Sequence, residues 1–253
     1  MIPLSAVIAL VVFLILCGAV GLAASIRHRV PEHHRNSDTK DSIKTAMGLI
    51  ATMAALLLGL LVASAKGAYD TNAGEVTRMA GKFAFLGRLL VDYGPKAAPL
   101  REQLALVLGH TEEGLWRRET ISPAEVEEHF RTGNRLYSSI LQLPADTDVE
   151  KNLRTQAASE AIQLGELRSL LIVQAVPSVA PPLLVVVVAW LFIIFFAFTF
   201  LAPPNATAHA ALALSAVAVA GAIFLVLELE QPFSGLLQIS PEPMEIARRQ
   251  IEK

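Results

Sequence analysis

The chain has 253 residues, of which 53% are hydrophobic and 17% charged, and its formal net charge is -2. A soluble globular domain carries about 25% charged residues, so this composition favours a chain with large membrane-embedded parts, and the small net charge gives no indication of nucleic-acid binding. The single cysteine, Cys17, excludes an intrachain disulfide and a cysteine-based metal site.

Four apolar runs are long enough to cross a ~30 Å hydrocarbon core as helices, which takes about 20 residues. The first run, residues 2–26, has no charged residue and begins without Lys or Arg, which favours a retained anchor over a cleaved signal peptide. The others cover residues 43–65, 181–202 and 207–227, and Asn205 or Thr207 is expected to cap the fourth. Helices are predicted because backbone polar groups in lipid must be satisfied within the segment.

Between the second and third spans, apolar residues recur at helical spacing and no strand alternation is visible. A stripe that starts at Val76 runs to a break at residues 92–95, and a helix continuous with the second span is one arrangement that it allows. Three further helices are predicted at residues 99–118, 122–143 and 146–176.

The predicted fold class is therefore an all-α integral membrane protein with four transmembrane helices and a helical extramembrane bundle between spans two and three. The spans are expected to form two hairpins. The predicted divisions are a first hairpin with a basic loop, a helical extramembrane domain, a second hairpin and a C-terminal tail, at residues 1–66, 67–179, 180–231 and 232–253.

Basic residues in short loops predict the orientation. The turn between the last two spans contains no basic residue. The loop between the first two spans contains five: Arg27, Arg29, Arg35, Lys40 and Lys44. This predicts a multi-pass protein of the inner (plasma) membrane with that loop in the cytoplasm. The helical domain and both termini would then face the periplasmic or outer side. Five basic residues on that side oppose this arrangement: Lys66, Arg78, Lys82, Arg248 and Arg249.

The second span carries a small or polar face along its whole length. Its members recur at three- and four-residue steps, and they are the candidate pore-lining residues: Thr45, Gly48, Thr52, Ala55, Gly59, Ala63, Lys66 and Asp70. Small faces allow close helix approach in membranes. The alternative is the lining of a pore that ends in a charged ring, but close helix packing is the favoured interpretation of this face.

Two acids, Glu228 and Glu230, end the fourth span. Acids inside a membrane often mark ion paths, but the favoured interpretation is an interfacial position where the carboxylates reach water. The first loop contains a cluster of His28, Glu32, His33 and His34. Its spacing is not that of a zinc site, so no metal is predicted. No nucleophile, phosphate-loop or zinc-protease motif is present, so neither an enzyme nor a cofactor is predicted.

The most specific pattern lies at the end of the chain. Glu230 is followed by the turn Pro232-Phe233-Ser234-Gly235 and then by the Ser-Pro-Glu-Pro segment at residues 240–243. This end resembles the hallmark of a bacterial membrane family known as a bestrophin-like domain of unknown function, and the order of spans and loops fits as well. The family often has an Asp-Arg pair where this chain has Glu230-Gln231, and a Trp near the outer end of the second span, where this chain has Tyr69.

The resemblance implies a relation to bestrophins, which are oligomeric anion channels with both termini in the cytoplasm, the reverse of the charge-based orientation. Together with the small face it leads to the hypothesis of an oligomeric, channel-like protein whose second span lines a pore. Its expected partners are the lipid bilayer, further copies of the chain and inorganic ions. The alternative is a non-conducting scaffold or sensor whose helical domain binds a partner, because that domain is larger than a minimal channel needs.

Overall fold

The computed structural model describes residues 3–27, 29, 37–116, 123–174, 181–201 and 205–252. Within these ranges the chain forms eight α-helices and one short 3-10 helix and no strand, which confirms the predicted all-α class. It divides into two compact units, Met1–Tyr69 with Pro177–Gln231, and Asp70–Val176 with Pro232–Lys253. Each unit has its own core.

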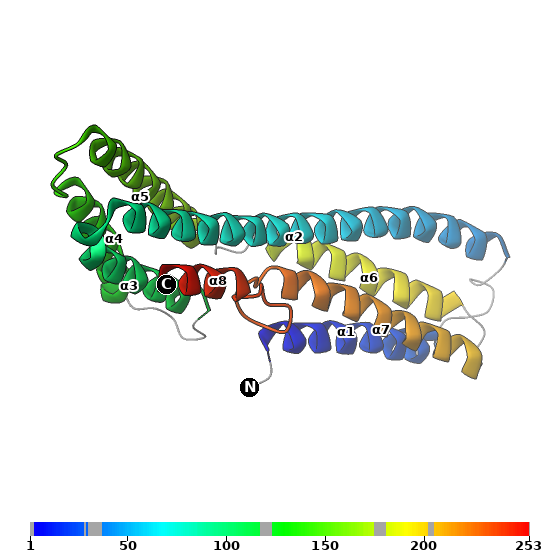
Figure 1. Cartoon of the computed structure of the whole chain (residues 1–253). Helices are drawn as coiled ribbons and strands as arrows, with labels where there is room; N and C mark the ends of the chain where they lie inside the picture. Colours follow the sequence, from blue (N-terminus) through cyan, green and yellow to red (C-terminus); the bar gives the residue numbers. More distant parts are fainter. Residues whose placement is uncertain are drawn as a thin grey trace. The chain divides into compact units, whose positions relative to one another are not determined.

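The first unit contains the apolar helices (Figure 1). They are α1 (Leu4–Arg27), the first part of α2 (Ser37–Tyr93), α6 (Pro181–Leu201) and α7 (Ala206–Leu229). All four helices are long and apolar enough to cross a membrane, which confirms the four predicted spans. Asn205 caps α7, since its side-chain oxygen accepts the Ala208 N–H at 2.7 Å.

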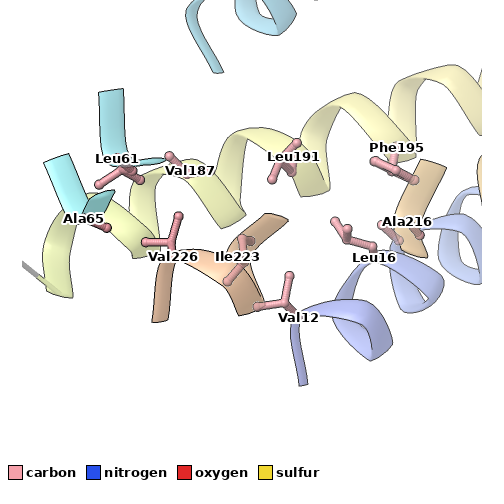
Figure 2. Close-up of a cluster of buried hydrophobic side chains, with 11 residues drawn as sticks. Val12, Leu16, Leu61, Ala65, Val187, Leu191, Phe195, Ala216, Ile223 and Val226 are labelled. Atoms are coloured by element: carbon pink, nitrogen blue, oxygen red, sulfur yellow. The ribbon is translucent and has the colours of Figure 1, made fainter. Parts of the chain in front are cut away.

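The core of this unit is built from one stripe of each helix. The helix α1 packs against α6 and α7, and Figure 2 shows the buried side chains that point toward one another: Val12, Leu16, Leu61, Ala65, Val187, Leu191, Phe195, Ala216, Ile223 and Val226. In lipid, apolar burial gives little net driving force between helices, so close van der Waals contact must hold them together. Alanines such as Ala19, Ala23 and Ala65 allow that close approach.

The helix α2 runs unbroken for 57 residues, through the second span and the stripe that follows it. No proline lies between Ser37 and Tyr93, so nothing removes a backbone donor from its interior. It ends where Gly94 adopts φ 95°, a left-handed conformation that favours glycine, directly before Pro95. The continuous arrangement is therefore the one that the chain adopts.

The second unit contains the rest of α2, the 3-10 helix η2 (Pro95–Ala97), α3 (Ala98–Trp116), α4 (Pro123–Leu141), α5 (Asp148–Gln174) and α8 (Glu242–Ile251). The predicted helices of the middle segment correspond to α3, α4 and α5. Large, fully buried side chains form the core: Phe83, Leu86, Leu104, Leu108, Leu136 and Ile140. Each contributes about 1.5–3 kcal/mol by burial from water.

The structure has a helix, α8, in the region that the sequence predicts to be a C-terminal tail. Its buried residues, Met244, Ala247 and Ile251, recur at helical spacing. The start signal is also present, since Glu242 and Pro243 open the first turn, and Arg248 stands in the last. The sequence thus contains both the helical spacing and the start signal, but the helix itself is only ten residues long.

The start of α5 is fixed by a capping box. The Thr147 Oγ1 accepts the Glu150 N–H at 3.2 Å, and the Glu150 carboxylate accepts the Thr147 N–H at 3.0 Å. Lys96 donates to Glu150 at 3.0 Å and to Asp146 at 2.9 Å. The Lys96 contact, followed by the backbone N–H groups of Thr147 and Asp146, lowers the pKa of Glu150 from 4.5 to about 2.

This pKa predicts a dependence of stability on pH. Because the pKa of Glu150 is lower in the folded state, its contribution is complete above pH 4.5 and is lost as the pH falls toward about 2. Unfolding of the detergent-solubilised protein, followed by circular dichroism across this window, should therefore show a steeper loss of stability for the wild type than for Glu150→Gln. Equal slopes would contradict this assignment.

Candidate functional site

The small or polar face of α2 lies on the outside of the folded chain. All eight of its residues are exposed, seven in the first unit and Asp70 at the start of the second: Thr45, Gly48, Thr52, Ala55, Gly59, Ala63, Lys66 and Asp70. A helix turns by about 100° per residue, which puts the buried Ala54, Leu61 and Ala65 nearly opposite this face. Packing among the described residues therefore does not explain why the face is small.

The backbone is open to the surroundings at two points on this face. No atom lies within 4 Å of a Cβ added to Gly48 or Gly59. The Thr52 hydroxyl donates to the Gly48 carbonyl at 2.9 Å, which leaves its oxygen lone pairs to face outward as acceptors. Lys66 places its Nζ 5.4 Å from the centre of the Tyr69 ring, within cation–π range. The face thus combines close backbone access with a cation near one end.

The adjoining flank of α2 has a different chemistry. It presents large apolar side chains, all exposed: Leu49, Met53, Leu56 and Leu60. Such side chains suit lipid tails, whereas glycine, alanine and threonine offer little contact area to lipid. The two faces of α2 therefore differ in chemistry: one presents large apolar side chains and the other small or polar ones.

Glu228, the first of the two acids that end the fourth span, is completely buried in the first unit. It accepts a hydrogen bond from the Ser5 hydroxyl, which is also completely buried, at the start of α1. The sequence favoured an interfacial position in which both carboxylates reach water, and the burial of Glu228 differs from that expectation. Glu230, in contrast, is half-buried. A buried acid needs donors, and Ser5, a lone hydroxyl in the first turn of an apolar span, was the signal that the sequence analysis missed.

The turn at residues 232–235 is anchored to α3. The Phe233 ring packs edge-to-face on the Trp116 ring, with centroids 5.6 Å apart and planes at 86°. Trp116 Nε1 donates to the Ile239 carbonyl at 2.8 Å, and the Ile239 N–H donates to the Pro232 carbonyl at 2.8 Å. Gly235 adopts φ 90°, which a residue with a Cβ rarely does. Pro232 is buried and Ser234 half-buried.

The segment after the turn is attached to the same helix. The Ser240 hydroxyl accepts the Glu242 N–H at 3.2 Å and so opens α8. Arg101 donates to the Ile251 carbonyl at 2.9 Å, and Arg248 pairs with Glu112. Burial raises the pKa of Glu112, and the nearby Arg248 opposes that shift. The motifs at the end of the chain thus have a structural role in the second unit.

The loop cluster His28, Glu32, His33 and His34 lies outside the described residues. Within the described ranges, no group of three or more His, Cys, Asp or Glu side chains is placed to hold a metal ion. The candidate functional features among the described residues are thus the small or polar face of α2 and the buried carboxylate of Glu228.

Four apolar spans and a helical bundle define an α-helical multi-pass membrane protein. The sequence profile of the bestrophin-like domain matches residues 4–244. The chain therefore belongs to the bestrophin-like family, as the motifs at its end indicated. No curated protein sequence matches the chain.

Solved structures share the fold. A variant of a bacterial bestrophin homologue from Klebsiella pneumoniae aligns over 99% of this chain and 98% of its own, with a TM-score of 0.71 and 13% identity. A second variant of that homologue aligns over 96% and 99%, with a TM-score of 0.64 and 14% identity. The crystal structure of a further membrane protein variant gives 0.70 over 96% of both chains at 13% identity.

Proposed function

We propose that the protein is an oligomeric, channel-like membrane protein in which the small face of α2 lines an ion-conducting path. The observation that carries this proposal is the exposure of that whole face on the side of α2 opposite its packed residues. A pore-lining helix packs within its own subunit through one side and faces the central axis of the oligomer with another side. Membership of the bestrophin-like family supports the same conclusion.

Copies of the chain would bring their α2 faces together around one axis. The glycines allow the helix backbones to approach the axis closely, and outward threonine oxygens can replace part of the hydration shell of an ion. Lys66 and Asp70 would stand near one mouth. The large apolar flank would face lipid or the neighbouring copy.

Reconstituted proteoliposomes test conduction directly. Ion efflux from vesicles that contain the protein should exceed that from empty vesicles, and crosslinking should give a defined oligomer. Efflux equal to that of empty vesicles across voltage, pH and calcium concentration would contradict the channel. It would favour the non-conducting scaffold or sensor, whose partner should be recovered with the full chain and lost on removal of residues 98–174.

The proposed orientation places the first loop in the cytoplasm and the helical domain outside the inner membrane. In a Cys17→Ser background, Ser138→Cys on exposed α4 should react with a membrane-impermeant maleimide added to spheroplasts. Asp41→Cys, exposed at the start of α2, should react only after permeabilisation. The reverse pattern would place both termini in the cytoplasm and overturn this orientation.

A further inference from the structure

A cavity lies among α3, α4 and α5 in the second unit. It has a volume of about 310 Å³, which is at the lower end of the size range of small-molecule sites. The described residues that line it all belong to the second unit: Val107, Gly133, Asn134, Leu136, Tyr137, Ala161, Ile162, Leu164, Gly165 and Arg168. A ligand site here is therefore independent of the ion path proposed along the spans.

The inner wall of the cavity is apolar. Val107 on α3, Leu136 on α4 and Leu164 on α5 each contribute a side chain that is only 2% exposed. Water beside such a wall gains few hydrogen bonds, so an apolar group that displaces it gains affinity. The inner wall thus favours the apolar body of a small molecule.

The wall that α5 contributes is built from small residues. Ala161 and Gly165 both line the cavity, and their spacing of four places them on one face of the helix. No atom lies within 4 Å of a Cβ added to Gly165. A larger side chain at residue 165 would therefore take up free space at the cavity without meeting the packed core.

Two uncharged polar side chains of α4 line the outer part of the cavity. Asn134 is exposed and Tyr137 is half-buried, and a spacing of three places them on one helix face. Within the described part of the chain, neither side chain makes a hydrogen bond or ion pair. The amide and the phenol can each donate and accept a hydrogen bond, so both are available to a ligand.

The cation in the lining is already engaged. Arg168 is 8% exposed and interacts with another residue of the chain. Its guanidinium also leaves no room for a side chain at residue 133, because a Cβ added to Gly133 would meet Arg168 Nη1 at 2.8 Å. Arg168 is thus part of the wall, and the polar contacts open to a ligand are those of Asn134 and Tyr137.

We propose that this cavity binds a small neutral molecule with an apolar body and one hydroxyl group, an alcohol or a phenol. A hydroxyl group can donate to the Asn134 amide oxygen while it accepts from the Tyr137 hydroxyl. The apolar body displaces water from the inner wall. A charged group would exchange its hydration for uncharged partners, which is costly.

Binding is tested by calorimetry on the detergent-solubilised full chain with benzyl alcohol, after subtraction of the heat measured with protein-free micelles. Binding should be saturable at concentrations up to about 10 mM, ten times a Kd of about 1 mM. Toluene, which lacks the hydroxyl group, should bind at least about fivefold more weakly. Benzoate and benzylammonium, which carry a charge, should bind at least about tenfold more weakly.

Three outcomes of this comparison would overturn the proposal. Absence of saturable benzyl alcohol binding would remove the site. Toluene binding as tight as that of benzyl alcohol would remove the role of the hydroxyl group. Benzoate or benzylammonium binding as tight as that of benzyl alcohol would show that the cavity does not select neutral molecules.

Two variants locate the site. Tyr137→Phe keeps the ring and removes one hydroxyl group, so it should weaken benzyl alcohol binding about fivefold and leave toluene binding unchanged. Gly165→Leu fills the cavity and should weaken binding of both molecules by at least about tenfold. Gly81→Leu is the matched control, because Gly81 is an exposed helical glycine of the same unit with open space at its Cβ.

The variants keep the assignment falsifiable. Unchanged benzyl alcohol binding in folded Gly165→Leu, or an equal loss in Gly81→Leu, would place the bound molecule elsewhere and contradict the site. If Gly165→Leu fails to fold, Tyr137→Phe decides, and equal benzyl alcohol binding in that variant and the wild type would contradict the assignment.

Discussion

Replacing Gly59 by phenylalanine should lower ion flux through the reconstituted protein by at least about tenfold, because a ring would project from the face that lines the proposed path. A Cβ at Gly59 meets no atom within 4 Å, so the single chain should accept the substitution without a clash. The loss of flux should therefore come without loss of folded protein. Efflux per folded oligomer is the measurement, with circular dichroism to confirm the helix content.

The neighbouring residue provides the control. Leu60 is 63% exposed but belongs to the large apolar flank, so Leu60→Phe adds a similar ring one residue away and should change flux less than about twofold. Equal flux in Gly59→Phe and the wild type would remove α2 as the lining helix. Equal losses in both variants would indicate a general defect and would also contradict the assignment of one face.

Replacing Trp116 by alanine should weaken the attachment of the C-terminal segment to α3, where Arg101 and Glu112 still hold α8. The substitution removes the edge-to-face contact with Phe233 and the hydrogen bond to the Ile239 carbonyl. Loss of a packed Trp side chain costs about 3 kcal/mol at the lower end of its range, and Trp116 is half-buried. The equilibrium population of the open form, in which residues 232–252 have left α3, should then increase about 100-fold.

Limited proteolysis measures this opening, provided that opening and closing are fast compared with cleavage. Trp116→Phe is the matched variant, because it keeps an aromatic ring against Phe233 and loses only the N–H donor, worth about 1 kcal/mol. Its cleavage rate should rise about fivefold. A Trp116→Ala chain that is cleaved no faster than Trp116→Phe would show that the ring contact does not hold the segment.

Local signals in the sequence were sufficient for most of the fold. Hydropathy alone located the four spans, and the Asn205 cap and the stop at Gly94-Pro95 each depend on residues a few positions apart. The helix α8 was missed because ten residues after a Pro-rich segment give a weak periodic signal. Its partners on α3, among them Arg101 and Glu112, are far away in the sequence.

The site was harder to predict because its decisive properties depend on distant partners. The face of α2 could be written down from spacing, but whether it packs or stays exposed is decided by the opposite side of the helix and its neighbours in α6 and α7. The buried Glu228 accepts a hydrogen bond from Ser5, and the Arg168 guanidinium leaves no room for a Cβ at Gly133 in another helix. No single-sequence pattern connects these pairs.

The hydrogen bond between Ser5 and Glu228 also constrains the order of assembly during translation, because it joins residues 223 positions apart. At about 5–20 residues per second, the ribosome makes Glu228 on the order of 10 to 45 s after Ser5. The helix α1 packs against α6 and α7, which are also made late. Of the four described spans, α1 is therefore made first, but it forms its contacts with α6 and α7 only after those two helices have been inserted.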